Sequence, residues 1–208
     1  MLGGILKTLD ELYPFDGACF LRYDAAKPWQ LLFATILSAQ CTDERVNQVT
    51  EGLFEKYPSL ESFAGAELGG LEAAVRPTGF FRMKAAHIKQ CAEMLIINYG
   101  GELPSGINEL TGLPGVGRKT ANVVRSHVFK LPSVVVDTHV MRVSRRLGLT
   151  RNTDPVKIEF DLMDALPEEH WLRYNQQIIS HGRRVCKARK PLCGQCALIK
   201  ECIYGKNE

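Results

Sequence analysis

The stretch Leu113-Pro-Gly-Val-Gly-Arg-Lys-Thr-Ala121 indicates how the chain folds. Two glycines follow a proline, and we expect a short helix over about 107–110, a tight turn, and a second helix over about 118–129. The glycines permit backbone conformations that side chains would block, and they let phosphate oxygens approach the N–H groups of a helix N-terminus. The pattern is not a Walker loop, in which four residues separate the glycines. It is typical of a helical hairpin that grips a DNA backbone, and it also fits a plain turn between helices.

Lys119 lies two residues after the second glycine. Most lysines on a helix are simply exposed, and this one could be no more than that. The alternative is an amine nucleophile, which must be neutral, and desolvation and a neighbouring cation such as Arg118 favour the neutral form. The sequence leaves both interpretations open.

Asp137 follows the apolar run Val134-Val-Val136 and precedes a predicted helix that carries Val140, Val143 and Leu147. The run could be a strand, but no partner strand is apparent, so we expect a buried extended segment. Asp137 fits the role of helix N-cap, which is common for this residue type. It could also be a catalytic carboxylate on a rigid mount, and the two roles are compatible. His139 could be a residue of the first turn of that helix or a partner of a catalytic side chain, and we expect no catalytic role of its own.

Helical periodicity dominates the rest of the chain. Ile88, Cys91, Ala92, Leu95, Ile96 and Tyr99 follow one helix face, and Val156, Phe160 and Met163 follow another, after an expected N-cap at Asp154 and a proline at the first helical position. Residues 31–39 are apolar nearly all round, as in a helix buried inside a bundle. The sequence therefore predicts an all-α protein.

Composition places the chain among ordinary globular proteins, with 208 residues, 45% hydrophobic and 24% charged. No apolar run is long enough to span a membrane, and the N-terminal residues lack the pattern of a secretory signal, so we expect a cytoplasmic protein without a membrane partner. Residues 1–100 carry 9 basic and 12 acidic side chains, a net of −3, whereas residues 101–208 carry 17 and 11, a net of +6. A basic C-terminal half favours a polyanionic partner, although it could also be a solvated face.

Four of the seven cysteines lie near the C-terminus, at positions 186, 193, 196 and 202. Without an export signal, such a cluster indicates metal ligands rather than disulfides. Four thiolates could hold one zinc ion or one [4Fe–4S] cluster, and the spacing alone leaves the two open. The cations Arg183, Arg184, Lys187, Arg189 and Lys190 surround the first ligand, where they could bind phosphates or balance the cluster's charge.

Together these motifs resemble the endonuclease III family, helix-hairpin-helix DNA glycosylases and lyases of base excision repair. The resemblance rests on residues 31–40, 113–121 and 136–140, on His181-Gly182, and on the four-cysteine tail. It covers nearly the whole chain in the same order. The cysteine spacing matches the family's iron–sulfur loop, so the resemblance favours [4Fe–4S] over zinc.

The resemblance implies two helical domains on either side of a DNA-binding cleft. One is a six-helix barrel of residues 22–132, with the hairpin at about 107–126, and the other joins residues 1–21 to 133–208 and carries the cluster. Lys119 matches the Schiff-base lysine and Asp137 the catalytic aspartate. The implied DNA-binding residues are Gln40, Phe80, Leu113, Gly115 and Gly117, together with the five cations near Cys186. Phe80 departs from the family pattern, where we expect an aliphatic wedge, and this leaves the opposite-base preference open.

The implied activity is removal of oxidised pyrimidines from double-stranded DNA through a Lys119 Schiff base, followed by strand cleavage 3′ to the abasic site, by a monomer. One alternative is an adenine-mismatch glycosylase, but such enzymes lack a lysine at this position and carry a further C-terminal domain. Another is a non-catalytic DNA-binding module, which would need neither Lys119 nor Asp137. An electron-transfer ferredoxin would not need the hairpin.

Overall fold

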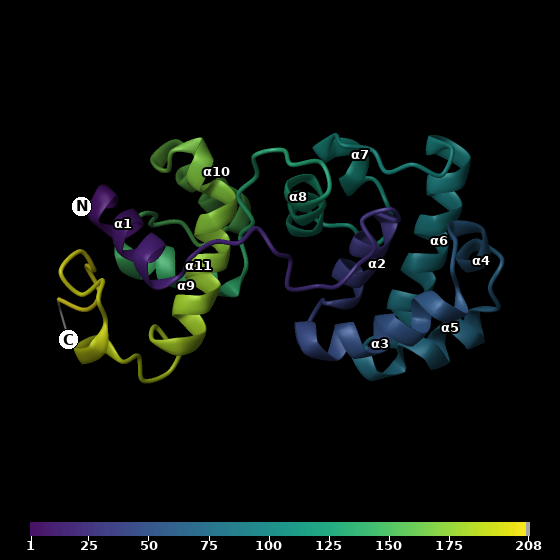
Figure 1. Cartoon of the computed structure of the whole chain (residues 1–208), viewed down its shortest axis with the longest axis horizontal. Helices are drawn as coiled ribbons and strands as arrows, with labels where there is room; N and C mark the ends of the chain where they lie inside the picture. The colour runs from purple at the N-terminus through teal and green to yellow at the C-terminus, as the bar shows by residue number, and fades with distance from the viewer. Residues whose placement is uncertain (207–208) are drawn as a thin grey trace. The chain divides into compact units, whose positions relative to one another are not determined.

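The computed structural model describes residues 1–206, and within them the chain is all-α, as predicted (Figure 1). The α-helices are α1 Leu2–Leu12, α2 Trp29–Leu37, α3 Asp43–Lys56, α4 Leu60–Ala64, α5 Leu68–Val75, α6 Phe81–Tyr99, α7 Ile107–Thr111, α8 Arg118–His127, α9 Thr138–Leu147, α10 Pro155–Ala165 and α11 Trp171–Arg184. Short 3-10 turns are η1 Arg76–Thr78, η2 Glu168–His170 and η3 Cys193–Gln195. None of the described helices is both long and apolar enough to cross a bilayer.

The chain divides into two compact units. The hairpin unit is Cys19–Leu131 and contains α2 to α8. The cysteine unit joins Met1–Ala18 to the chain from Pro132 onward and contains α1 and α9 to α11. Each unit has its own apolar core, so each positions its own candidate residues.

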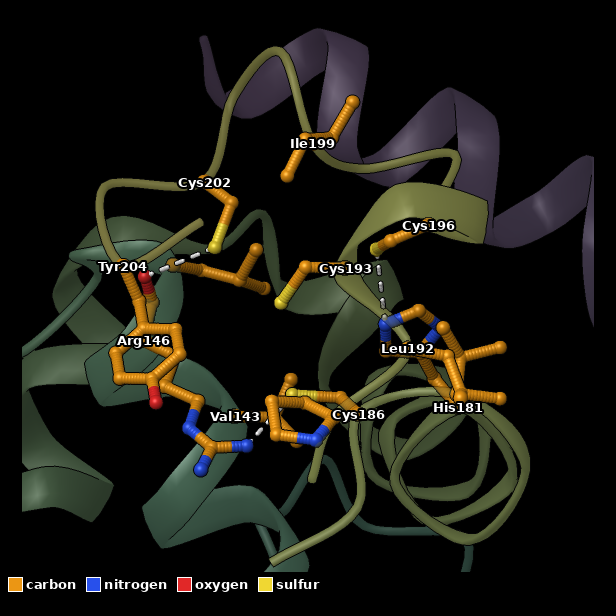
Figure 2. Close-up of a pocket in the computed structure, with 13 residues that line it drawn as sticks. Val143, Arg146, His181, Cys186, Leu192, Cys193, Cys196, Ile199, Cys202 and Tyr204 are labelled. Carbon is orange, nitrogen blue, oxygen red and sulfur yellow. Dashed lines mark hydrogen bonds between the residues drawn. The ribbon is translucent and has the colours of Figure 1, made fainter. Parts of the chain in front are cut away.

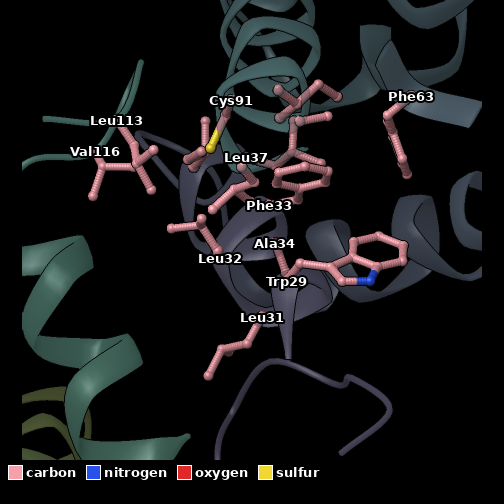
Figure 3. Packing of buried hydrophobic residues seen from close by; sticks show 14 of the residues in the cluster. Trp29, Leu31, Leu32, Phe33, Ala34, Leu37, Phe63, Cys91, Leu113 and Val116 are labelled. Carbon is pink, nitrogen blue, oxygen red and sulfur yellow. The ribbon is translucent and has the colours of Figure 1, made fainter. Parts of the chain in front are cut away.

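The hairpin unit is built around α2, which contacts α3, α6 and α8. All nine of its residues are buried, as expected for an apolar helix inside a bundle. Trp29 and Phe33 pack against Phe63, with ring centroids 5.6 and 5.0 Å apart (Figure 3). The helix ends two residues earlier than the apolar run, and Ala39 is exposed in the following turn.

The predicted buried face of α6 is confirmed: Ile88, Cys91, Ala92 and Leu95 are fully buried, and Ile96 and Tyr99 are partly buried against the same core. The burial of the Cys91 thiol raises its pKa to about 12, so this cysteine is an inert part of the core.

The predicted buried face of α10 is wrong for Val156 and Phe160, although its third residue, Met163, is partly buried against the core. Val156 and Phe160 are 39% and 48% exposed, whereas Ile158 and Leu162 are fully buried. The helix carries two apolar stripes, and periodicity does not distinguish them. Its start is as predicted: Asp154 caps it by accepting hydrogen bonds from the N–H groups of Val156 and Lys157, and Pro155 is the first helical residue.

The run Val134–Val136 is buried and extended and forms no strand, as predicted. The Asn175 side chain of α11 donates a hydrogen bond to the Val135 carbonyl over 2.8 Å. This bond replaces the ladder bond that a strand partner would have made. The run thereby holds Asp137 at the start of α9.

Candidate active site and cysteine cavity

The Gly-rich stretch forms the predicted turn between α7 and α8. Gly115 has a φ of +76°, and a Cβ at this position would lie 2.7 Å from His87 Nδ1, so only glycine fits. Gly117 has a φ of −88° and open space around it, so it is not needed for a left-handed conformation. Leu113 is 2% exposed and Val116 6%, and both belong to the core around α2 (Figure 3). The Leu113 side chain therefore anchors the turn, leaving only its backbone for a ligand.

The start of α8 differs from the starts of α3, α9 and α10. Thr42, Asp137 and Asp154 cap those three helices with side-chain oxygens. Gly117 has no side chain and gives α8 no such cap. The first N–H groups of a helix lack intrahelical acceptors and carry the positive end of the helix dipole. The N-terminus of α8 is thus suited to an anionic oxygen.

Lys119 lies in this first turn of α8 and is exposed. It belongs to the hairpin unit, whereas Asp137 belongs to the cysteine unit. An exposed amine beside a helix start that favours phosphate is accessible to a DNA strand.

Asp137 is the N-cap of α9, because its Oδ1 accepts a 2.8 Å hydrogen bond from the Val140 N–H. The cap prediction is therefore confirmed, and Val140, Val143 and Leu147 are buried as expected. His139 lies in the first turn and meets Arg142, with 3.1 Å between Nδ1 and Nη2. Burial lowers the pKa of His139, and the Asp137 carboxylate opposes that shift. The cap fixes the carboxylate on a half-buried, rigid mount.

Three predicted DNA-binding residues from separate loops line one hollow of the hairpin unit: Gln40, Phe80 and Gly115. The hollow has a volume of about 200 Å³. Gln40 and Phe80 both have left-handed backbones, with φ of 54° and 48°. Non-glycine residues rarely adopt this conformation, and those that do concentrate at binding and catalytic sites. Phe80 is 60% exposed, so its ring faces solvent at the rim.

Sequence reasoning missed Met83, Lys84 and His87, which also line this hollow. They lie on the first two turns of α6, at helical spacing after Phe80. That spacing could have indicated them, but only once Phe80 was known to lie at the start of the helix.

The four C-terminal cysteines line one small cavity of the cysteine unit, with a volume of about 20 Å³ (Figure 2). All four are free thiols, and Figure 2 shows their sulfur atoms pointing into the cavity. N–H groups donate to two of them, from Arg146 Nη1 to Cys186 Sγ over 3.3 Å and from Gly205 N to Cys202 Sγ over 3.4 Å. Burial, followed by the neighbouring thiols of Cys186 and Cys202, raises the pKa of Cys196. Such N–H donors stabilise thiolates, the deprotonated form in which cysteines bind a metal.

No three His, Cys, Asp or Glu side chains in residues 1–206 form a group that could hold a metal ion. A zinc site needs its thiolates about 2.3 Å from one ion, and therefore close together. The same four thiols are also the donor set that a [4Fe–4S] cluster requires, and they line one cavity.

The five cations predicted to contact DNA are all exposed: Arg183, Arg184, Lys187, Arg189 and Lys190. Arg146 holds the loop between the first two cysteines, since its guanidinium donates to the Lys187 and Ala188 carbonyls over 2.8 and 3.2 Å. Lys190 has a left-handed φ of 51°. The loop thus presents its charge to solvent from a fixed backbone.

Comparisons with known proteins agree with these features. The family model described as "HhH-GPD superfamily base excision DNA repair protein" matches residues 33–168. Endonuclease III of Synechocystis sp. is 51% identical over 95% of this chain and 90% of its own length. Endonuclease III of Bacillus subtilis is 45% identical over 97% of this chain and 91% of its own length. The chain belongs to the endonuclease III family.

A solved structure of a trapped endonuclease III–DNA covalent intermediate superposes with a TM-score of 0.91 at 44% identity, covering 97% of this chain and 94% of that one. The prediction of a base excision repair enzyme of the endonuclease III family, a DNA glycosylase and abasic-site lyase, is confirmed by this match and by the family assignment.

Proposed function

We propose that Lys119 is the amine nucleophile and Asp137 the catalytic carboxylate of a glycosylase and lyase that acts on oxidised pyrimidines in double-stranded DNA. The observation that carries this proposal is the position of Lys119, an exposed lysine in the first turn of α8, where no side chain caps the helix. A phosphate bound at that helix start would bring the sugar of its nucleotide near the amine. The likeness to a covalent endonuclease III–DNA intermediate supports an enzyme nucleophile.

A base inside a duplex shields the sugar carbon C1′, so the nucleotide must first rotate out of the stack. This costs a few kcal/mol and is easiest for a damaged, poorly stacked base. In our proposal the turn at Gly115 and Gly117 holds the phosphates. Gln40 and Phe80 occupy the vacancy, which is supported by their position on one hollow with strained backbones.

The neutral ε-amine of Lys119 then attacks C1′, and the C1′–N bond electrons leave with the damaged base, which takes up a proton. Asp137 stabilises the positive charge that develops on the sugar. Opening of the sugar ring gives an iminium between Lys119 and C1′. The iminium makes a C2′ proton acidic, and its loss expels the 3′ phosphate and cleaves the strand.

We further propose that Cys186, Cys193, Cys196 and Cys202 hold a [4Fe–4S] cluster. When bound, the cluster supplies iron–thiolate bonds that staple the C-terminal segment. The exposed cations Arg183, Arg184, Lys187, Arg189 and Lys190 then contact the DNA backbone. In this proposal the hairpin unit corresponds to the barrel domain of residues 22–132 and the cysteine unit to the cluster domain. The protein acts as a monomer in the compartment that contains the DNA, the bacterial cytoplasm.

Borohydride trapping tests the proposal, because it reduces an iminium to a stable amine. The wild-type chain should be trapped on duplexes that carry thymine glycol or an abasic site. Lys119→Gln should lower trapping and strand cleavage by at least about 10³-fold, since no other amine replaces the nucleophile. Lys130→Gln, at an exposed lysine shortly after α8, is the matched control and should be trapped normally. Trapping that survives Lys119→Gln would remove Lys119 from this role.

Asp137→Asn separates catalysis from capping in the same assay. Asparagine caps helices about as well as aspartate, so the melting temperature should hardly change. Loss of the negative charge should lower base removal by about 100-fold while DNA affinity persists. A variant that loses stability but keeps its turnover would leave Asp137 with the cap alone.

A further inference from the structure

Lys84 of α6 is a buried lysine whose hydrogen bonds go to backbone carbonyls. Its residue is only 2% exposed, and its ammonium donates two hydrogen bonds of 2.7 Å, one to the Leu37 carbonyl and one to the Thr78 carbonyl. Burial lowers the pKa of Lys84. Transferring a lysine ammonium from water to the protein interior costs free energy, so the burial of Lys84 needs an explanation.

The two acceptors mark the starts of two loops. Leu37 is the last residue of α2, and the turn after it carries Gln40. Thr78 is the last residue of η1, and Phe80 follows after one glycine. The carbonyl of a terminal helical residue has no partner inside its helix, and a lysine near it is a suitable donor. The Lys84 side chain therefore donates to one otherwise unpaired backbone carbonyl at the start of each loop.

The residues that these loops present, Gln40 and Phe80, have strained backbones. Gln40 and Phe80 are both in the left-handed region, and both are exposed. Such conformations persist only where the surrounding structure imposes them. The two loops are separated by forty residues of sequence yet face one hollow, which Lys84 also lines.

We propose that Lys84 is a positioning residue that holds the Gln40 and Phe80 loops in register, so that both tips enter the vacancy left by a rotated nucleotide. The inference rests on the proposed function, in which Gln40 and Phe80 fill that vacancy. Lys84 itself does not touch the reacting atoms. Its effect on the reaction rate appears only on double-stranded DNA, where the rotated nucleotide leaves a gap in the base stack.

Lys89 provides a matched control on the same helix. Its ammonium also donates to two loop carbonyls, those of Ala64 and Ala66, and it pairs with Glu93 over 3.5 Å. Neither Ala64 nor Ala66 lines the hollow. A lysine that merely supports α6 should behave alike at positions 84 and 89, whereas a positioning lysine should act at position 84 alone.

The experiment compares single-turnover borohydride trapping on an abasic site in a duplex and in a single strand. Methionine fills a similar volume without the charge or the donors. Lys84→Met should lower the duplex rate by about tenfold or more and leave the single-strand rate within about twofold of wild type, because a single strand has no stack to fill. Lys89→Met should leave both rates within about twofold. An equal loss on both substrates, or equal losses in the two variants, would overturn the proposal.

Phe80→Ala adds a double-mutant cycle. If Lys84 acts through the Phe80 loop, Lys84→Met should cost much less in a Phe80→Ala background than in the wild type, and additive losses would contradict this. Lys84→Gln, which keeps one donor group, covers the case in which Lys84→Met fails to fold. If neither variant folds while Lys89→Met does, Lys84 serves the fold and the proposal is lost. Wild-type trapping and Lys119→Gln report on the proposed function separately.

Discussion

The loops of the hairpin unit and the C-terminal segment from Cys186 to Lys206 are both predicted to meet DNA, but they are held in opposite ways. The Gln40 and Phe80 loops leave helices of a continuous aromatic core. The C-terminal segment contains only the 3-10 turn η3, and within it Leu198 and Cys202 alone are buried. A segment with so little apolar burial cannot offset its loss of chain entropy. Packing therefore holds the first region, whereas in our proposal the ligated thiols hold the second.

Arg146 is the main polar support of the C-terminal segment. Besides the Lys187 and Ala188 carbonyls, its guanidinium lies 4.5 Å from the centre of the Tyr204 ring, and its carbonyl accepts a 3.1 Å hydrogen bond from the Tyr204 N–H. These contacts join both ends of the segment to α9. They orient it, but they bury little apolar surface.

The largest expected effect comes from Cys202→Ser, which removes one proposed cluster ligand. We expect loss of iron and sulfide, rapid proteolysis after about residue 186, and DNA affinity weaker by about tenfold or more, because the basic loop is no longer fixed. The hairpin unit should keep its fold. Iron analysis, limited proteolysis with mass spectrometry and DNA titration measure these changes, with Cys19→Ser outside the cavity as the control. A variant with an intact C-terminal segment would show that the thiols are not its main support.

Phe33→Ala tests whether core packing stabilises the hairpin unit. Phe33 is fully buried between Trp29 and Phe63, so its truncation should destabilise the hairpin unit by about 3–5 kcal/mol. Trp29 lies in the hairpin unit and Trp171 in the cysteine unit, so single-tryptophan variants report on each by denaturant unfolding. Phe160→Ala, at a half-exposed position of α10, should cost far less. Equal losses of unfolding free energy in Phe33→Ala and Phe160→Ala would contradict the claim that core packing holds the loops.

A smaller effect on the stability of the hairpin unit is expected when the pH is lowered. Burial, helped by the nearby Lys130 cation, lowers the pKa of His127 from 6.5 to about 4. The folded state therefore favours the neutral ring, and its contribution to stability is complete above pH 6.5 and is lost as the pH falls towards 4. By pH 4 the loss of unfolding free energy in the hairpin unit should reach about 3 kcal/mol, and His127→Gln should flatten this dependence. Unfolding followed by Trp29 fluorescence between pH 4 and 7 measures this, and an unchanged slope in His127→Gln would assign the pH dependence to other groups.

The fold could be predicted where a local signal had one meaning. The cap Asp154-Pro155, the turn at Gly115 and the all-round apolar α2 each specify a local structure, and each is present. The buried face of α10 could not be predicted, because two stripes compete and tertiary packing selects the one with Ile158 and Leu162.

The candidate site could be predicted only in part. The resemblance indicated Gln40 and Phe80, but no local rule predicts a left-handed backbone at either residue type. Lys84 has no motif of its own, because its role depends on two carbonyls that come together only in the folded chain. Leu113 was assigned to DNA, whereas its side chain packs into the core.

The central claim is that the hairpin unit carries the nucleophile. The most direct test is to trap the wild-type protein with borohydride on a duplex containing an abasic site, digest the complex, and locate the modified residue by mass spectrometry. The account predicts a single adduct on the Lys119 ε-amine. An adduct on another amine, such as the N-terminus or Lys84, or strand cleavage without any adduct, would contradict it.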